Sequence, residues 1–118
     1  MLDHVVIPVR DTEASRLFYE PVMDGLGAKV VMAEPGFILF GNDDGFVALR
    51  QRDEVLPIHV AFRTDRAGVD SFYETALASG GTDNGGPGVR ADYHPSYYAA
   101  FVHDPDGHNI EAVCHQPA

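Results

Sequence analysis

The 118-residue sequence predicts an α+β fold of two βαβββ modules, whose curved sheets pair around a central cleft. The main observation behind this prediction is an internal repeat, in which His4 and His59 each open a β-rich run. A Phe-Tyr-Glu triplet follows each histidine, at residues 18–20 and 72–74, and a glycine comes seven residues after each glutamate. A repeat of this length indicates that one supersecondary unit occurs twice. The two histidines should therefore occupy equivalent places.

The repeat and the chain length predict one domain over residues 1–118, with module one at about residues 1–54 and module two at about residues 55–118. Each module holds one helix and a few strands, which is too little to cover both faces of its own sheet. Pairing the two sheets, with the helices outside, leaves a cleft between the modules. Because ligands bind in clefts of this kind, we expect the functional site there.

Two helices are predicted, one in each module. Asp11 or Thr12 can cap the first helix, and Asp65 can cap the second. Pro21 removes a backbone donor from the first helix, so we expect a kink or an early end there, whereas Gly80 should end the second. The apolar residues expected on the buried faces are Leu17, Phe18 and Val22 in the first helix and Val69, Phe72, Tyr73, Ala76 and Leu77 in the second.

The remaining β-rich runs supply the strands of the two sheets. Both modules end in a hairpin, across an Asp-Gly turn at residues 44–45 and across an Asp-Pro-Asp-Gly turn at residues 104–107. Residues 82–93 contain four glycines or prolines in succession and are predicted to form a loop rather than a regular strand. The predicted strands are residues 4–9, 29–32, 37–40, 46–49, 58–63, 97–103 and 108–115.

The amino-acid composition limits the binding partners and the cellular compartment that we expect for this chain. A net charge of −10 and a pI near 4.7 argue against nucleic acid and anionic membranes, because an acidic chain repels phosphate groups. No apolar run approaches the ~20 residues of a membrane span, and the opening strand pattern leads us to expect no export signal. Cys114 is the only cysteine, so no internal disulfide can form. We therefore expect a cytoplasmic protein whose partner is a small molecule.

Four stretches of the sequence form a recognisable pattern. They are the opening Leu-Asp-His-Val at residues 2–5, the two Phe-Tyr-Glu triplets, and Asp-Pro-Asp-Gly-His-Asn-Ile-Glu at residues 104–111. This pattern covers essentially the whole chain and resembles the vicinal oxygen chelate superfamily, which contains glyoxalase I, extradiol dioxygenases and bleomycin-resistance proteins. In that superfamily, the first strand of each module supplies a histidine and the last strand a carboxylate, all binding one divalent metal.

The resemblance implies that His4, His59 and Glu111 bind one divalent ion per site, either Fe, Mn, Ni or Zn. It also implies a homodimer, with the modules paired within one chain or between two chains. The fourth ligand of glyoxalase I has no counterpart. Counting four residues past the glycine of the first hairpin turn, as Glu111 lies four past Gly107, leads to Leu49. A shift of one residue leads to Ala48, and neither of these two side chains binds a metal.

Two imidazoles and one carboxylate leave open positions for substrate and oxygen, as in non-haem Fe(II) enzymes. The resemblance therefore predicts a metal-dependent enzyme acting on a small substrate chelated through vicinal oxygens, as a glyoxalase-like lyase or a dioxygenase. A metal-free small-molecule-binding protein of the bleomycin-resistance type is the alternative, and an accessory module without chemistry is another. For Glu111, the alternative to a metal is an ion pair with Arg63 or Arg50, since burying an unpaired carboxylate is costly.

Residues 90–98 contain His94 and three tyrosines, two of them at positions 97 and 98, near the mouth of the expected cleft. His94 and Tyr97 are candidates for acid–base catalysis, because such groups suit proton transfer near neutral pH. Arg63 and Tyr98 are candidates for substrate binding. The alternatives for this segment are aromatic packing on a sheet or a contact between subunits.

Overall fold

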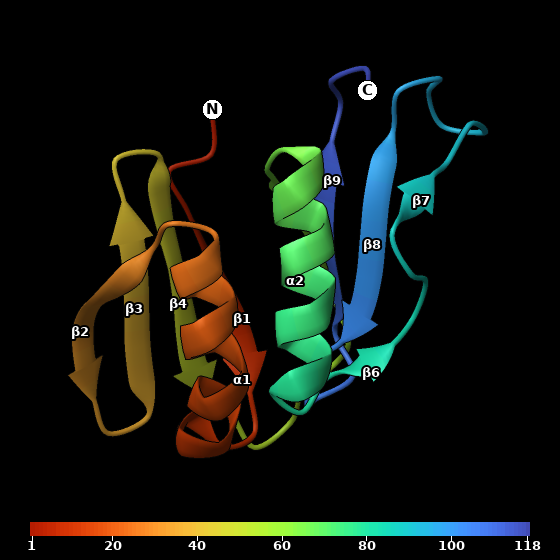
Figure 1. Cartoon of the computed structure of the whole chain (residues 1–118). Helices are drawn as coiled ribbons and strands as arrows, with labels where there is room; N and C mark the ends of the chain where they lie inside the picture. Colours follow the sequence, from red (N-terminus) through yellow and green to blue (C-terminus); the bar gives the residue numbers. More distant parts are fainter.

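The computed structural model describes all 118 residues and has an α+β fold, as the sequence predicts, with two halves that lie side by side (Figure 1). The first half is a βαβββ unit that consists of β1 (His4–Val9), α1 (Thr12–Gly25), β2 (Lys29–Glu34), β3 (Phe37–Asn42) and β4 (Gly45–Gln51). The second half has one short strand more and consists of β5 (His59–Arg63), α2 (Arg66–Ala78), β6 (Thr82–Asp83), β7 (Gly88–Val89), β8 (Tyr98–His103) and β9 (Asn109–Cys114). The strand order is β1-β4-β3-β2 in the first sheet and β5-β9-β8-β6 in the second, where β7 also pairs with β8.

One hydrophobic core of 19 buried residues spans both halves. The helices α1 and α2 contact each other and lie on the same side of the two sheets (Figure 1). Strand alternation decides which residues enter the core. In β1, Ile7 and Val9 are buried, and in β5, Val60 and Phe62 pack against the core. The other side chains of these strands lie on the face turned away from the helices, which we term the outer face.

Helix α1 begins where the Asp11 carboxylate accepts hydrogen bonds from the backbone N–H groups of Glu13 and Ala14. It continues through Pro21 to Gly25, so an early end at the proline was wrong. Pro21 lies on the exposed side of the helix. The carbonyl of Leu17, which loses its donor to the proline, therefore faces water and can be hydrated. Leu17 itself is 75% exposed, so its placement on the buried face was also wrong.

Helix α2 agrees with the sequence prediction at both ends. The Asp65 side chain accepts a hydrogen bond from the Gly68 N–H, and the helix stops at Ala78, shortly before Gly80, whose φ is +101°. Val69, Phe72 and Ala76 form its buried face, as predicted, whereas Leu77 is 37% exposed, so its placement on that face was wrong. None of the helices is both long enough and apolar enough to cross a membrane.

The predicted loop over residues 82–93 contains two short strands, so that prediction was wrong for residues 82–83 and 88–89. Both strands pair with β8, whose outer backbone groups would otherwise be unpaired. Between them, Asn84 N donates to the carbonyl of Phe101, and Phe101 N donates to the carbonyl of Gly85. Hydrogen bonds to the open edge of β8 stabilise these two short strands more than the low strand propensity of the glycines destabilises them.

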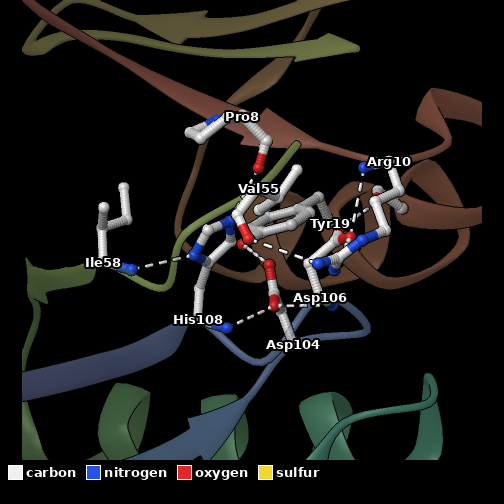
Figure 2. Close-up of polar contacts among 9 residues, drawn as sticks. Pro8, Arg10, Tyr19, Val55, Ile58, Asp104, Asp106 and His108 are labelled. Atoms are coloured by element: carbon white, nitrogen blue, oxygen red, sulfur yellow. Dashed lines mark hydrogen bonds and ion pairs between the residues drawn. The ribbon is translucent and has the colours of Figure 1, made fainter. Parts of the chain in front are cut away.

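The Asp-Pro-Asp-Gly-His segment joins the two halves (Figure 2). His108 is fully buried, and its Nε2 donates a hydrogen bond to the carbonyl of Pro8 in β1. Buried Asp104 accepts the hydroxyl hydrogen of Tyr19 from α1, and the neighbouring Asp106 forms an ion pair with Arg10. Sequence analysis placed this segment in a turn and did not anticipate that it fixes the relative position of the halves.

Candidate functional site

The side chain of Glu111 is the centre of the strongest candidate site. Glu111 lies in β9, is 1% exposed, and projects from the outer face of the second sheet. His59 Nε2 donates to its Oε1 over 2.8 Å, and the Tyr97 hydroxyl donates to its Oε2. We call Glu111, His59 and Tyr97 the Glu111 cluster. Each carboxylate oxygen of Glu111 therefore has its own donor within the chain.

Strand pairing explains how these residues meet. β5 and β9 are parallel neighbours, with His59 opposite Asn109 and Ala61 opposite Glu111. Because alternate residues share a face, His59 and Ala61 lie on the same side as Glu111, and the imidazole reaches the carboxylate diagonally. The methyl group of Ala61 leaves that space free. Tyr97 directly precedes β8, the strand on the other side of β9.

Electrostatics keep Tyr97 in its protonated form. Burial, and then the hydrogen bond to the Glu111 carboxylate, raise the pKa of Tyr97 to about 12. At neutral pH, this hydroxyl is therefore a donor. The Glu111 carboxylate contacts the His59 imidazole, and no arginine bridges to it. Of the two arginines considered as partners, Arg50 instead stacks on Phe37, with 4.7 Å between its Cζ and the ring centre.

His4 lies apart from the Glu111 cluster. It projects from β1 in the other sheet, and its Nδ1 lies 2.7 Å from the carboxylate of neighbouring Asp3. His4, His59 and Arg63 all line a cleft of about 780 Å³ between β1 and β5, but Glu111 does not. Within one chain, no three His, Cys, Asp or Glu side chains stand close enough to hold a metal ion. The structure thus brings two of the three expected ligands together and leaves His4 outside.

The remaining candidates have separate surroundings. The ring of His94 packs edge-on against His115, with centroids 5.9 Å apart, and its Nδ1 accepts a hydrogen bond from Ser96 N. His115 in turn packs edge-on against Tyr97 at 5.2 Å, so His94 adjoins the Glu111 cluster through an aromatic contact. Tyr98 points the other way, toward α2. Its hydroxyl donates to Asp70 over 2.6 Å, which removes it from the outer face.

Comparison with known proteins assigns the chain to a family. A model described as the Glyoxalase/Bleomycin resistance protein/Dioxygenase superfamily matches residues 1–112. The chain belongs to this superfamily. Members of the superfamily bind small-molecule substrates and commonly a divalent metal. No curated protein matches the chain.

Solved structures of superfamily proteins share the fold. A glyoxalase/bleomycin resistance protein from Albidiferax ferrireducens is 25% identical, with a TM-score of 0.86 over 97% of this chain and 98% of that chain. The fosfomycin resistance protein FosX from Mesorhizobium loti is 26% identical, with a TM-score of 0.74 over 97% and 91% of the two chains. A lactoylglutathione lyase from Agrobacterium tumefaciens is 18% identical, with a TM-score of 0.74 over 97% and 92%, which shows the fold alone.

Strand register identifies the residue of the first half that corresponds to Glu111. Glu111 faces the residue two positions after His59 across the ladder of β5 and β9. In the equivalent ladder of β1 and β4, the residue two positions after His4 faces Ala48. Leu49, the place reached by counting from the turn, is fully buried in the core. The count was off by one residue because the turn before β9 is longer than the turn before β4.

Proposed function

We propose that the chain is a divalent-metal-dependent enzyme of the superfamily, acting on a small substrate chelated through two vicinal oxygens. The observation that carries this proposal is the Glu111 carboxylate, which is 1% exposed, lies on the outer face of the sheet and contacts a histidine nitrogen but no lysine or arginine. A cation held by this carboxylate and the histidine would neutralise a charge whose burial is otherwise costly.

The donor atoms fit a divalent ion. An imidazole nitrogen and a carboxylate oxygen are suitable ligands for Fe, Mn, Ni and Zn. His59 and Glu111 would supply two ligands from the second sheet, and His4 would supply the third. Since His4 of the same chain lies outside the Glu111 cluster, we propose that His4 of a second copy completes the site in a homodimer. A bound ion would supply Lewis acidity to the chelated oxygens or, in the ferrous case, the redox chemistry of a dioxygenase.

The chain's own residues would bind and orient the substrate. Tyr97 holds the Glu111 carboxylate in place through its one O–H, and that hydroxyl would donate to a substrate oxygen once a bound ion takes over the carboxylate. His94, exposed beside the Glu111 cluster, would exchange protons with solvent. Arg63 lines the cleft with His4 and His59 and would contact the substrate there. The burial of the single cysteine, Cys114, accords with our proposal of a cytoplasmic protein.

The name of one structural neighbour supports a role in small-molecule chemistry. It is the fosfomycin resistance protein, which is 26% identical to this chain. The cleft of about 780 Å³ is of a size that suits a small molecule. We therefore propose lyase or dioxygenase chemistry for this chain rather than action on a macromolecule.

Elemental analysis of the purified protein tests the metal proposal. We expect about one Fe, Mn, Ni or Zn per chain, and loss of this metal in Glu111→Gln and in His59→Ala. His103→Ala is the matched control, because His103 lies on the second sheet and outside the Glu111 cluster. A metal content that remains negligible after anaerobic reconstitution with Fe(II), or that survives Glu111→Gln, contradicts the proposal. Sedimentation equilibrium of the same samples tests the homodimer.

A second function is favoured by one specific observation. Both oxygens of Glu111 already accept hydrogen bonds from His59 and Tyr97, so the cluster is satisfied without an ion. In that case, the chain would be a metal-free binding protein of the bleomycin-resistance type, and the cleft would hold an apolar or aromatic ligand. Ligand screening of metal-depleted protein, with binding unaffected by added Zn²⁺ or Fe²⁺, would support this function.

A further inference from the structure

Arg90 is a half-buried arginine beside the Glu111 cluster that has no carboxylate partner. Of the seven arginines in the sequence, only Arg10 and Arg16 form ion pairs, and Arg90 is the one of the other five whose guanidinium stacks on Phe101 beside the Glu111 cluster. Its one side-chain hydrogen bond runs from Nη2 to the carbonyl of Gly86 over 2.7 Å. A guanidinium has five N–H donors, so most of its donor capacity remains free.

Phe101 connects this guanidinium to the Glu111 cluster. The Arg90 Cζ lies 5.4 Å from the centre of the Phe101 ring, and that ring lies 6.3 Å from the ring of His59. Phe101 is also directly opposite Glu111 in the ladder of β8 and β9, so their side chains share the outer face. The outer face thus presents a guanidinium, then an apolar ring, then the imidazole and carboxylate of the Glu111 cluster.

The loop between β6 and β7 is shaped around the guanidinium. A Cβ atom at Gly88 would lie 3.0 Å from Nη1 of Arg90, and one at Gly85 would lie 3.2 Å from Nη2. Gly85 also has a φ of +136°, which side chains other than glycine rarely adopt. Glycines at these two places leave the space that the guanidinium occupies. The guanidinium lies in this space, with free donors, at the edge of the candidate site.

We infer that Arg90 binds an anionic group of the substrate, so that the substrate is a small carboxylate-bearing compound. A guanidinium recognises a carboxylate through two parallel hydrogen bonds, and the Phe101 ring offers an apolar surface to the part of the substrate between its two ends. The vicinal oxygens would lie at the Glu111 cluster and the carboxylate at Arg90. This inference rests on the proposed small-molecule site and does not require the metal.

Two probes of matched shape test the inference by calorimetry. Protocatechuate carries two vicinal hydroxyls and a carboxylate, whereas its benzyl alcohol analogue carries the same hydroxyls and no charge. We expect the wild-type protein to prefer protocatechuate by tenfold to a hundredfold (the order expected for a charge-assisted hydrogen bond), and Arg90→Gln to lose that preference while its affinity for the alcohol stays unchanged. Arg90→Lys should keep part of the preference, because it keeps the charge and loses the paired geometry.

The matched control is Arg66→Gln. Arg66 stacks on Tyr98 at 4.7 Å, with the same chemistry but on the helix side of the second sheet, so this variant should keep the preference. A wild-type protein that does not distinguish the probes, or an Arg90→Gln variant that remains folded and still distinguishes them, overturns the inference. Metal content is measured in the same samples. A metal-free protein that prefers the carboxylate only when Arg90 is present would contradict the metal proposal and support this inference, and a metal-loaded protein without the preference would do the reverse.

Discussion

His108 Nε2 donates a hydrogen bond of 2.7 Å to the carbonyl of Pro8, joining residues that are 100 positions apart (Figure 2). The second ring nitrogen, Nδ1, accepts the backbone N–H of Ile58 over 3.0 Å. Because a carbonyl can only accept and a backbone N–H can only donate, the two partners fix one neutral tautomer of the imidazole. The ring is fully buried, so both backbone groups depend on it.

We expect His108→Ala to lower the free energy of unfolding by about 3 kcal/mol, since it leaves a cavity and two unpaired buried backbone groups. Urea denaturation followed by circular dichroism measures this change. His103→Ala is the control, because His103 is only half-buried and its one hydrogen bond, of 3.3 Å, is within the same turn. Equal effects of the two substitutions would contradict the joining role of His108.

Substitutions of Tyr19 and Tyr73 provide a matched test of the contact between the two halves. Both hydroxyls donate to an aspartate, Tyr19 to buried Asp104 and Tyr73 to exposed Asp83. Burial raises the pKa of Tyr19 well above its ordinary value, and Asp104 adds to this effect. Tyr19→Phe should therefore lower the free energy of unfolding by about 1–3 kcal/mol, whereas Tyr73→Phe should change it by less than about 0.5 kcal/mol. Similar losses measured by urea denaturation would argue against a special role of the buried pair.

Sequence patterns predicted the modules correctly because the signals were local and occurred twice. The alternation in residues 4–9 and 58–63 placed both histidines opposite the core, and the spacing to Glu111 brought that carboxylate next to His59. In contrast, the sequence could not predict the helix side of Tyr98, which adjoins Tyr97 in sequence but points toward Asp70. It also could not predict that His108 would bond to Pro8, since that contact depends on how the halves pack.

The predicted metal ligands show which features of the candidate site local sequence patterns cannot predict. His4 and His59 occupy equivalent places in the repeat. This equivalence does not determine whether His4 lies close to His59 of the same chain or to His59 of a second chain. Counting from the turn glycine led to Leu49, because the length of a turn cannot be read from the position of its glycine alone. The register of the strand ladders instead identifies Ala48 as the counterpart of Glu111. The sequence analysis gave Arg90 no role, because Arg90 follows a glycine-rich stretch whose three-dimensional path depends on pairing with β8.

The raised pKa of Tyr97 predicts a specific dependence on alkaline pH. The folded-state pKa of about 12 lies above the ordinary value of 10.0, so the stabilisation is fully present below pH 10 and is lost as the pH rises from about 10 to about 12. We expect this loss to be about 1 kcal/mol, because the ring is only half-buried and water screens the pair. Ultraviolet titration of tyrosinate should show one late-titrating group fewer in Tyr97→Phe. In Glu111→Gln, Tyr97 should titrate at lower pH, and an unchanged titration curve would contradict the contact.

Gly81 and Gly25 should respond in opposite directions to alanine. A Cβ at Gly81 would lie 2.7 Å from Cε1 of buried Phe18 and 2.8 Å from the carbonyl oxygen of Ala76. Gly81→Ala should therefore lower the free energy of unfolding by about 1–3 kcal/mol. Gly25 lies at the end of α1, where a Cβ would have no neighbouring atom within 4 Å, so Gly25→Ala should raise stability by about 0.5 kcal/mol. Thermal unfolding curves of the two variants distinguish these outcomes, and a destabilised Gly25→Ala would refute the steric argument.

Ala48→Glu should restore the fourth ligand of the superfamily and tighten metal binding. Ala48 corresponds in register to Glu111 and lies on the outer face of the first sheet, opposite Val6. A second carboxylate adds a charged ligand to His4, His59 and Glu111, and we expect the dissociation constant of Zn²⁺ to fall by roughly tenfold. Because binding to the folded state raises the unfolding temperature, a thermal-shift titration with Zn²⁺ measures the gain even if the free variant is less stable.

Leu49→Glu is the control for Ala48→Glu. Its carboxylate would enter the core, so the variant should lose several kcal/mol of stability that Zn²⁺ does not restore. If the Ala48→Glu and wild-type proteins have the same Zn²⁺ dependence, the outer faces of the two sheets do not share one metal site.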